Sequence, residues 1–428
     1  MPIPVYFRRE LQSAFAGDIC DDLVSRILYS TDASLYQIEP MGVVFPRTLD
    51  DLSAVVALAA KYRVPLIARG AGSSLGGQAI GAGIVIDTSR YLNHLLEIDP
   101  DAGTVTAEPG VLLSLLNRQA GKYNLMFGPD PASADRATLG GSIGNNATGA
   151  HSIVYGMAAD HILSAEVLLA DGSPATFSTM TLDEAEAKAG SKSLEAQIYR
   201  TCLDIRRDHA EAIRQSYPLT WRRASGYNLN YLLPYSYNQP PLWAEVDDRP
   251  YPPIRAGEIN LAPLLAGSEG TLAILRKITV RLVTKPRRTM LGVLTYTGIA
   301  EACEAVPELL ERHPSAIELI PGDLIRLARS IPAYASQLSF VQGNPEALLV
   351  VEFSGEDETQ LRRMVQSLSP DVFIAATAPQ QAQVWNVRKV GLGIFNSLPG
   401  DAKALSFIED IAVPVEKLGV FVREVERI

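Results

Sequence analysis

The sequence contains few of the features that would place it in a membrane, in a disulfide-rich class or on a nucleic acid. Cys20, Cys202 and Cys303 are far apart and form no CxxC pair, so they predict neither a disulfide framework nor an iron–sulfur site. No apolar run approaches the length of a membrane span, and the N-terminus, MPIPVYFRRE, has no apolar signal core. The net charge of −10, without basic blocks, argues against a nucleic-acid partner. Together these absences predict a cytoplasmic enzyme.

The 428 residues, 47% of them hydrophobic, are enough for two or three globular domains. Periodicity predicts a capped amphipathic helix over 50–64, strands over 65–68 and 83–89, and a hairpin formed by 94–99 and 103–110. A proline-rich stretch, 235–257, predicts an irregular surface excursion. After residue 286 strands alternate with helices, which indicates an α+β sheet layered with helices. The strands predicted there cover 289–297, 316–320, 347–353, 371–376 and 405–411.

A glycine-rich loop, ARGAGSSLGGQ (68–78), follows an apolar run and predicts a backbone that can approach a phosphate closely. The loop does not match the nicotinamide-dinucleotide motif GxGxxG, because the third position after Gly72 is Leu75 instead of glycine. In addition, a strand follows the loop where the motif requires a helix. A P-loop fails because no Lys-Ser/Thr follows the last glycine. The remaining structural alternative is a tight turn in a hairpin, but the loop is richer in glycine, serine and arginine than a turn requires.

Two further glycine runs sharpen the choice. The second, PDPASADRATLGGSIGNNATGAHSIVYG (129–156), could wrap a diphosphate from another side with its backbone N–H groups. Its asparagines and threonines could bond to polar atoms of a cofactor, although a long surface loop is the plain alternative. The third, GSEGTLAI (267–274), carries a carboxylate, Glu269, suited to accept hydrogen bonds from ribose hydroxyls.

In this order and spacing the three runs, with 30–48 and SGYNLN (225–230), resemble the PCMH-type FAD domain, also called the vanillyl-alcohol-oxidase type. Within it the chain is similar to the branch of D-lactate dehydrogenases, the flavin subunit of glycolate oxidase and D-2-hydroxyglutarate dehydrogenases. The N-terminal segment, 1–30, predicts one or two short helices with a Gly-Asp break. From about residue 30 onward, the resemblance implies a two-subdomain FAD-binding domain (31–286) and a ferredoxin-like α+β substrate or cap domain (287–428).

The resemblance also implies which residues bind FAD. Some relatives attach the flavin covalently through a histidine in the first loop, and the matching residue here is Ser73, so we expect non-covalent FAD. The first loop is expected to hold the pyrophosphate, the second the ribityl chain and ring, and the third the adenosine side and core. The implied contacts are Arg69, Gly70, Ala71, Gly72, Ser73, Ser74, Leu75 and Gln78; Pro129, Asp130, Thr138, Gly140, Gly141, Asn145, Asn146 and Gly149; and Glu269 and Ile274.

For the substrate, VWNVRKVGLG (384–393) matches a stretch whose arginine holds a carboxylate, which points to Arg388, with Lys403 as a weaker candidate. A planar guanidinium can pair bidentately with a 2-hydroxy acid, although a solvated charge on a helix face is the alternative. His151 and His161 are interpreted as structural hydrogen-bonding residues. The family's histidine motif, which supplies metal ligands and the base, has no match here. We therefore expect base, zinc and [4Fe-4S] only in a longer protein, beyond residue 428.

The function implied is an FAD-dependent dehydrogenase that oxidises D-lactate, glycolate or D-2-hydroxyglutarate to the 2-oxo acid. Electrons would leave to an iron–sulfur domain, a quinone or a carrier protein. Two alternatives stay open: a sugar or alcohol oxidase of the same superfamily that reduces O₂, and a non-catalytic flavoprotein subunit for electron transfer. A cytoplasmic location is expected, and a peripheral position at the inner face of the membrane is compatible with it.

Overall fold

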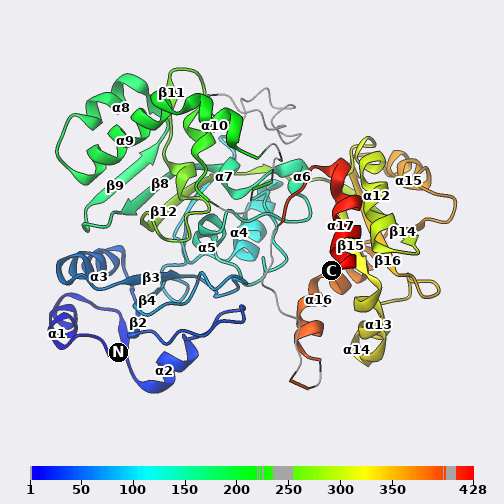
Figure 1. Cartoon of the computed structure of the whole chain (residues 1–428), viewed down its shortest axis with the longest axis horizontal. Helices are drawn as coiled ribbons and strands as arrows, with labels where there is room; N and C mark the ends of the chain where they lie inside the picture. The colour runs from blue at the N-terminus through cyan, green and yellow to red at the C-terminus, as the bar shows by residue number, and fades with distance from the viewer. Residues whose placement is uncertain are drawn as a thin grey trace. The chain divides into compact units, whose positions relative to one another are not determined.

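The computed structural model describes residues 2–218, 220, 222–223, 226–234, 254–398, 400–401 and 411–428. The chain divides into two compact units (Figure 1). The first is built mainly from Met1–Gly149 and Tyr155–Thr284. The second comprises Ala150–Val154, Lys285–Leu405 and Ala412–Ile428. Each unit has its own sheets and core, and the two are described separately. No helix in the described ranges is long and apolar enough to cross a membrane.

The first unit begins with a small sheet of four strands in the order β1-β2-β4-β3, in which β2, β4 and β3 run parallel. The helix over 49–62 follows from the sequence: Thr48 caps its first turn together with Asp51, and Arg63 ends it in the left-handed conformation. Its apolar face, including Leu52 and Val55, packs in the core of this sheet. The elements are α1 (Val5–Ala14), β1 (Asp18–Cys20), α2 (Leu23–Leu28), β2 (Gly42–Phe45), α3 (Leu49–Tyr62), β3 (Leu66–Arg69) and β4 (Ile84–Asp87).

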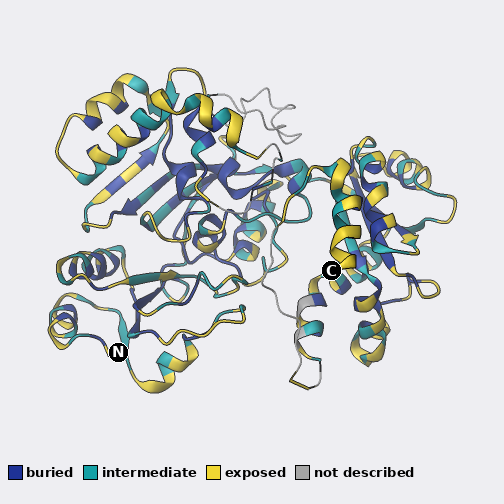
Figure 2. Ribbon diagram, viewed as in Figure 1, coloured by how far each residue is buried: buried dark blue, intermediate teal, exposed yellow. Residues whose placement is uncertain are grey.

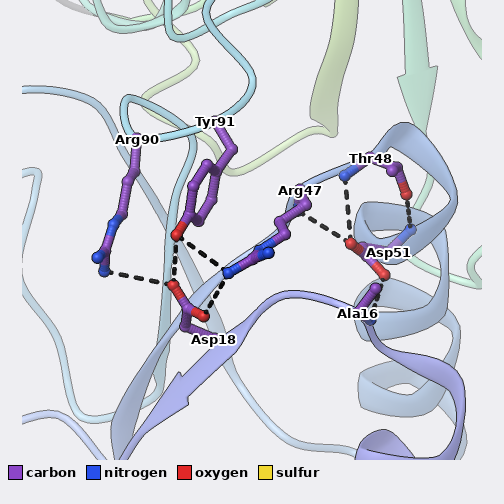
Figure 3. Close-up of polar contacts among 7 residues, drawn as sticks. All are labelled: Ala16, Asp18, Arg47, Thr48, Asp51, Arg90 and Tyr91. Atoms are coloured by element: carbon purple, nitrogen blue, oxygen red, sulfur yellow. Dashed lines mark hydrogen bonds and ion pairs between the residues drawn. The ribbon is translucent and has the colours of Figure 1, made fainter.

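Polar contacts fasten strand β1 to this sheet (Figure 3). Asp18 accepts hydrogen bonds from the Tyr91 hydroxyl at 2.7 Å and from Arg47 Nη2 at 3.2 Å, and it pairs with Arg90 at 3.4 Å. The Tyr91 hydrogen bond, followed by the arginines, lowers the pKa of Asp18. Asp51 accepts from the backbone N–H groups of Ala16, at 2.8 Å, and of Arg47, at 2.9 Å. The sequence reading expected only short helices here and missed β1.

A second, five-stranded antiparallel sheet has the order β5-β6-β12-β8-β9. Its buried side chains, with those of α4 and of the helices after β9, form the largest core among the described residues (Figure 2). The elements are β5 (Leu95–Asp99), β6 (Thr104–Ala107), α4 (Leu113–Ala120), β8 (Ile162–Leu168), β9 (Pro174–Ser178), α8 (Leu182–Ala189), α9 (Leu194–Asp208), α10 (Ala210–Ser216) and β12 (Ile274–Arg281).

The second unit contains an antiparallel sheet in the order β15-β16-β14-β17. Numbered along the chain this order is 2-3-1-4, which is the ferredoxin-like arrangement, so the predicted α+β class is confirmed. Helices α12 and α15 pack on one face, and α13 and α16 pack on the other. The elements are β14 (Arg288–Tyr296), α12 (Ile299–Leu310), β15 (Ala316–Pro321), α13 (Gly322–Ser330), β16 (Ala347–Gly355), α15 (Glu358–Gln366), β17 (Phe373–Ala375), α16 (Ala378–Asn396) and α17 (Leu418–Arg427).

Some details differ from the sequence predictions. Strands β3 and β4 are parallel, so the hairpin alternative for the first glycine loop is wrong. The second glycine run contains two short helices that periodicity could not predict, α5 (Leu139–Gly144) and α6 (Ser152–Tyr155), and a third, α7 (Ala158–His161), follows directly after it. Most of the predicted strand 405–411 and most of the proline-rich stretch 235–257 lie outside the described residues.

Candidate cofactor and substrate sites

The first glycine loop leaves β3 at Arg69 and is closed by that arginine. Arg69 Nη1 donates to the carbonyl of Ala79 at 3.0 Å, and the guanidinium lies 5.0 Å from the ring centroid of Tyr29. Gly72 has φ +65°, and any Cβ there would overlap the guanidinium, so this position requires glycine. Between the two ends, Ala71 and Ser73 are exposed. Arg69 therefore holds the loop shape, while the backbone around Ser73 faces outward.

The first and second runs meet at Gly70. A Cβ on Gly70 would overlap the hydroxyl of Thr138, and the same hydroxyl accepts from the backbone N–H of Gly141 at 3.2 Å as the N-cap of α5. Gly140 donates its N–H to Pro109 O at 2.8 Å and lies against that proline. Close approach of the two runs therefore depends on the absence of a side chain at Gly70, and packing of the second run on Pro109 depends on its absence at Gly140.

The second run has one open edge and one closed edge. Among the described residues, nothing lies within 4 Å of the position that a Cβ on Gly144 would take, and Asn145 beside it is exposed. At the other end a Cβ on Gly149 would overlap the backbone of Asp130. Pro129, before this aspartate, is buried. The open edge at Gly144 is the part of this run that has room for a ligand.

The third run joins both of the others. The backbone N–H of Gly267 donates to Ile143 O at 3.0 Å, and that of Glu269 donates to Gly144 O at 2.9 Å. Gln78 Nε2, from the first run, donates to Glu269 Oε1 at 3.4 Å, across 191 residues of sequence. Glu269 itself is exposed. The three glycine runs, far apart in the chain, thus form one cradle.

The chemistry of this cradle fits a dinucleotide. Exposed loop backbone without large side chains supplies N–H groups for phosphates. Glu269 can accept hydrogen bonds from ribose hydroxyls, and the open edge at Gly144 leaves space beside the cradle.

Two predicted cofactor residues are engaged inside the protein. The side chain of Asn146 is buried, accepts from the N–H of Ala159 at 2.9 Å and donates to the carbonyl of Arg223 at 3.3 Å. Ile274, the first residue of β12, is buried in the core of the small sheet. Their contact with a cofactor stays a prediction, and their observed role is to position the second and third runs.

Two buried titratable residues lie just after the second run. His161 Nε2 donates to the carbonyl of Tyr155 at 2.6 Å, and burial lowers the pKa of His161 to about 4. Asp160 accepts from the hydroxyl of Tyr231 and from the N–H of Met157 at 2.7 Å. Burial nevertheless raises the pKa of Asp160 to about 6. Both residues are completely buried, so they support the local fold rather than meet a ligand.

In the second unit Arg388 projects from α16 and pairs bidentately with Glu318 of β15. The distances are 2.7 Å from Nε to Oε2 and 2.9 Å from Nη2 to Oε1. This contact uses one edge of the guanidinium, whose other edge, at Nη1 and Nη2, retains N–H donors suited to a second carboxylate. Lys403 lies outside the described residues.

A second carboxylate lies on the same sheet face as Glu318. Glu352 of β16 is 3% exposed, lies 3.0 Å from His151 Nε2 and accepts from the Ser315 hydroxyl at 2.8 Å. Val350 is the register partner of Glu318, and Glu352 is two residues further along the strand. Alternation therefore places both carboxylates on one face, about 7 Å apart. Sequence reasoning missed both, although an acidic residue within an apolar strand, as in AIELI and LLVVEF, is a readable signal.

The described part of the chain shows no group of three or more His, Cys, Asp or Glu side chains that could hold a metal ion.

Comparison with known proteins defines the class first. Residues 40–178 match the FAD binding domain, and residues 285–428 match the C-terminal domain of FAD linked oxidases. The chain therefore contains an FAD-binding domain followed by the C-terminal domain of FAD linked oxidases, which matches the PCMH-type branch that the glycine runs predicted.

Particular relatives narrow the branch. The chain is 30% identical to D-2-hydroxyglutarate dehydrogenase of Escherichia coli (strain K12), over 98% of this chain and 41% of the relative. It is 25% identical to glycolate oxidase subunit GlcD of Bacillus subtilis (strain 168), over 95% of this chain and 72% of the relative. A solved alkyldihydroxyacetonephosphate synthase shares the fold, with a TM-score of 0.62 and 19% identity over 91% of this chain and 68% of that one. The chain thus spans about two-fifths of the D-2-hydroxyglutarate dehydrogenases that it matches.

Proposed function

We propose that this chain binds FAD non-covalently in the cradle of the three glycine runs and serves the oxidation of a D-2-hydroxy acid to the 2-oxo acid. The observation that carries the proposal is the convergence of the runs: Gly70 on Thr138, Gln78 on Glu269, and Glu269 on Gly144. The names of the relatives, which are dehydrogenases or oxidases of 2-hydroxy acids, supply the substrate class.

In this proposal the residues of this chain bind the cofactor and the substrate and orient them. Exposed loop backbone around Ser73 holds phosphate oxygens, and the open edge at Gly144, the last residue of α5, gives room to the ribityl chain. Arg388 holds the substrate carboxylate through the guanidinium edge that Glu318 does not use, while Glu318 fixes the plane of the guanidinium. FAD, when bound, supplies a hydride acceptor for the substrate Cα hydrogen. The base that takes the hydroxyl proton, the ligands of any zinc, and the electron acceptor (an iron–sulfur domain, a quinone or a carrier) are assigned to positions outside the described residues.

The visible absorption spectrum tests the proposal. Purified protein, reconstituted with FAD if necessary, should show a flavin absorption band. A denaturant should release the flavin as free FAD, because Ser73 stands where some relatives have the histidine that binds the flavin covalently. In the full-length protein without oxygen, D-2-hydroxyglutarate, D-lactate or glycolate should bleach this band, and L-2-hydroxyglutarate and L-lactate should not. Bleaching by an L-acid alone would contradict the stereochemistry, and failure to take up FAD would refute the cofactor.

A further inference from the structure

A short segment outside the three glycine runs packs against the first of them. Residues 31–37 form a clip whose ends are joined by an antiparallel bridge between Thr31 and Gln37. Inside the clip, Asp32 accepts from the backbone N–H of Ser34 at 2.9 Å, and Ser34 Oγ accepts from the N–H of Tyr36 at 3.1 Å. These local bonds give the clip a defined shape.

The clip is attached to both halves of the first glycine loop. The N–H of Ala33 donates to the carbonyl of Gly72 at 3.1 Å, and the N–H of Ala79 donates to Asp32 Oδ2 at 3.3 Å. A ligand of this loop therefore meets a surface formed by the clip and the loop together.

Tyr36 is the large side chain by which the clip touches the loop. Its Cδ2 lies 3.0 Å from the position that a Cβ on Gly77 would take, and Gly77 has φ +83°. The ring thus lies directly against the backbone of the loop, in space that another residue at Gly77 would fill. Nevertheless Tyr36 is 47% exposed, so much of this ring still faces outward. An apolar ring half open to water and supported from behind is the arrangement on which a planar base stacks.

The neighbour of Gly77 indicates which planar group belongs there. Gln78, the next residue, reaches the exposed carboxylate of Glu269, which is suited to ribose hydroxyls. A phosphate-binding backbone, a ribose acceptor and an aromatic ring thus come together at one end of the loop. That is the set of groups an adenosine diphosphate moiety requires.

We propose that Tyr36 is the stacking platform for the adenine base of FAD. This inference rests on the proposed FAD binding and deepens it, because it assigns one end of the first loop to the adenosine half of the cofactor. The hydroxyl of Tyr36 is not needed for this role, whereas its ring is.

Binding of cofactor fragments to the apoprotein tests the proposal without turnover. Dissociation constants for FAD, ADP-ribose and FMN are measured by flavin fluorescence and calorimetry for wild type, Tyr36→Ala and Tyr36→Phe. Tyr123→Ala is the matched control, because Tyr123 is 52% exposed and belongs to a 3₁₀ turn outside the clip and the three glycine runs. Tyr36→Ala should weaken FAD and ADP-ribose roughly tenfold, the usual contribution of a stacked base, and leave FMN unchanged. Tyr36→Phe and Tyr123→Ala should bind all three ligands as the wild type does.

Each other outcome is decisive. Unchanged binding of FAD and ADP-ribose by Tyr36→Ala, in a protein that still takes up FAD, overturns the inference and leaves the proposed function intact. An equal loss of FMN affinity also overturns it, because the ring would then serve the flavin half or the loop shape. If the wild type binds neither FAD nor ADP-ribose, the proposed function and the inference fail together.

Discussion

The two candidate sites are built from different materials. In the first unit the cradle is made of backbone, with Gly70, Gly140 and Gly149 in positions where a Cβ would overlap a neighbour. In the second unit the polar groups are side chains: Arg388 is held by Glu318, and Glu352 is held by His151. A backbone site should be sensitive to added volume, and a side-chain site to changed charge or geometry. The predictions below test this difference.

The largest effect is expected from added volume in the cradle. Gly149→Ala places a methyl group into the backbone of Asp130, which cannot move aside as a flexible side chain can. We expect a loss of about 3 kcal/mol in the free energy of unfolding, at the upper end for overpacking. Gly121→Ala is the matched control, because nothing in the described structure lies within 4 Å of a Cβ there. Urea unfolding curves that coincide for the two variants would contradict the prediction.

The pH dependence of stability is the second property of the first unit to be tested, because two buried residues there have pKa shifts with opposite effects on it. The raised pKa of Asp160, about 6 against an ordinary 3.8, adds stability that is complete below pH 3.8 and is lost as the pH rises through 6. The lowered pKa of His161, about 4 against 6.5, adds stability that is complete above pH 6.5 and is lost as the pH falls through 4. Each contribution is on the order of 3 kcal/mol, and since one grows while the other falls over the same pH interval, their pH dependences oppose each other in the wild type.

Single substitutions should separate the two contributions. Asp160→Asn leaves only the histidine, so the free energy of unfolding should fall as the pH drops from 6.5 to 4. His161→Gln leaves only the carboxyl, so the free energy should rise over the same interval. Urea titrations at several pH values measure both slopes, and parallel slopes for the two variants would refute the assignment.

In the second unit geometry should matter more than volume. Arg388→Lys keeps the charge but loses the bidentate contact with Glu318, so we expect about 1 to 2 kcal/mol of destabilisation. The same variant should weaken substrate binding in the full-length enzyme, seen as a higher KM for the D-2-hydroxy acid. Arg362→Lys is the control, since Arg362 forms an exposed i,i+4 pair with Glu358 at 3.8 Å, and it should change neither quantity.

The smallest effect on stability is expected at the open edge of the cradle. Gly144→Ala meets no described neighbour within 4 Å, and alanine favours the end of α5 slightly, so stability should stay the same or rise. Affinity for FAD should nevertheless fall, because the methyl group enters the space that we assign to the cofactor. Unchanged FAD affinity would place the cofactor away from Gly144.

The sequence predicted the parts of this fold that depend on local pattern. The periodicity of 50–64 and the alternation of strands and helices after residue 286 predicted elements that the structure contains, although the residue that caps the helix is Thr48. The glycine runs also predicted the FAD-binding domain. They were readable because a positive φ, or the close approach of another part of the chain, restricts a position to glycine. In contrast, α5 to α7 are too short to show a helical period, and β1 is three residues long. These elements depend on tertiary contacts.

Partners far apart in the sequence could not be predicted. Nothing around Arg388 indicates Glu318, seventy residues earlier, as the group that holds it. Asn146 looked like a cofactor donor, but its amide is used by Ala159 and Arg223, which only the folded chain brings near it. Side-chain chemistry was readable from the sequence, whereas its allocation to partners was not.

The closure of the first loop by Arg69 has a consequence for binding kinetics and entropy. Fixing the backbone of one residue costs about 1 to 2 kcal/mol of conformational free energy. A flexible loop of this length would incur that cost for each of its residues when the ligand binds. Because Arg69 bonds to Ala79 and stacks on Tyr29, the loop is already ordered when the chain has folded. Its ligand can therefore associate with a preformed surface, and most of the interaction energy remains available as affinity.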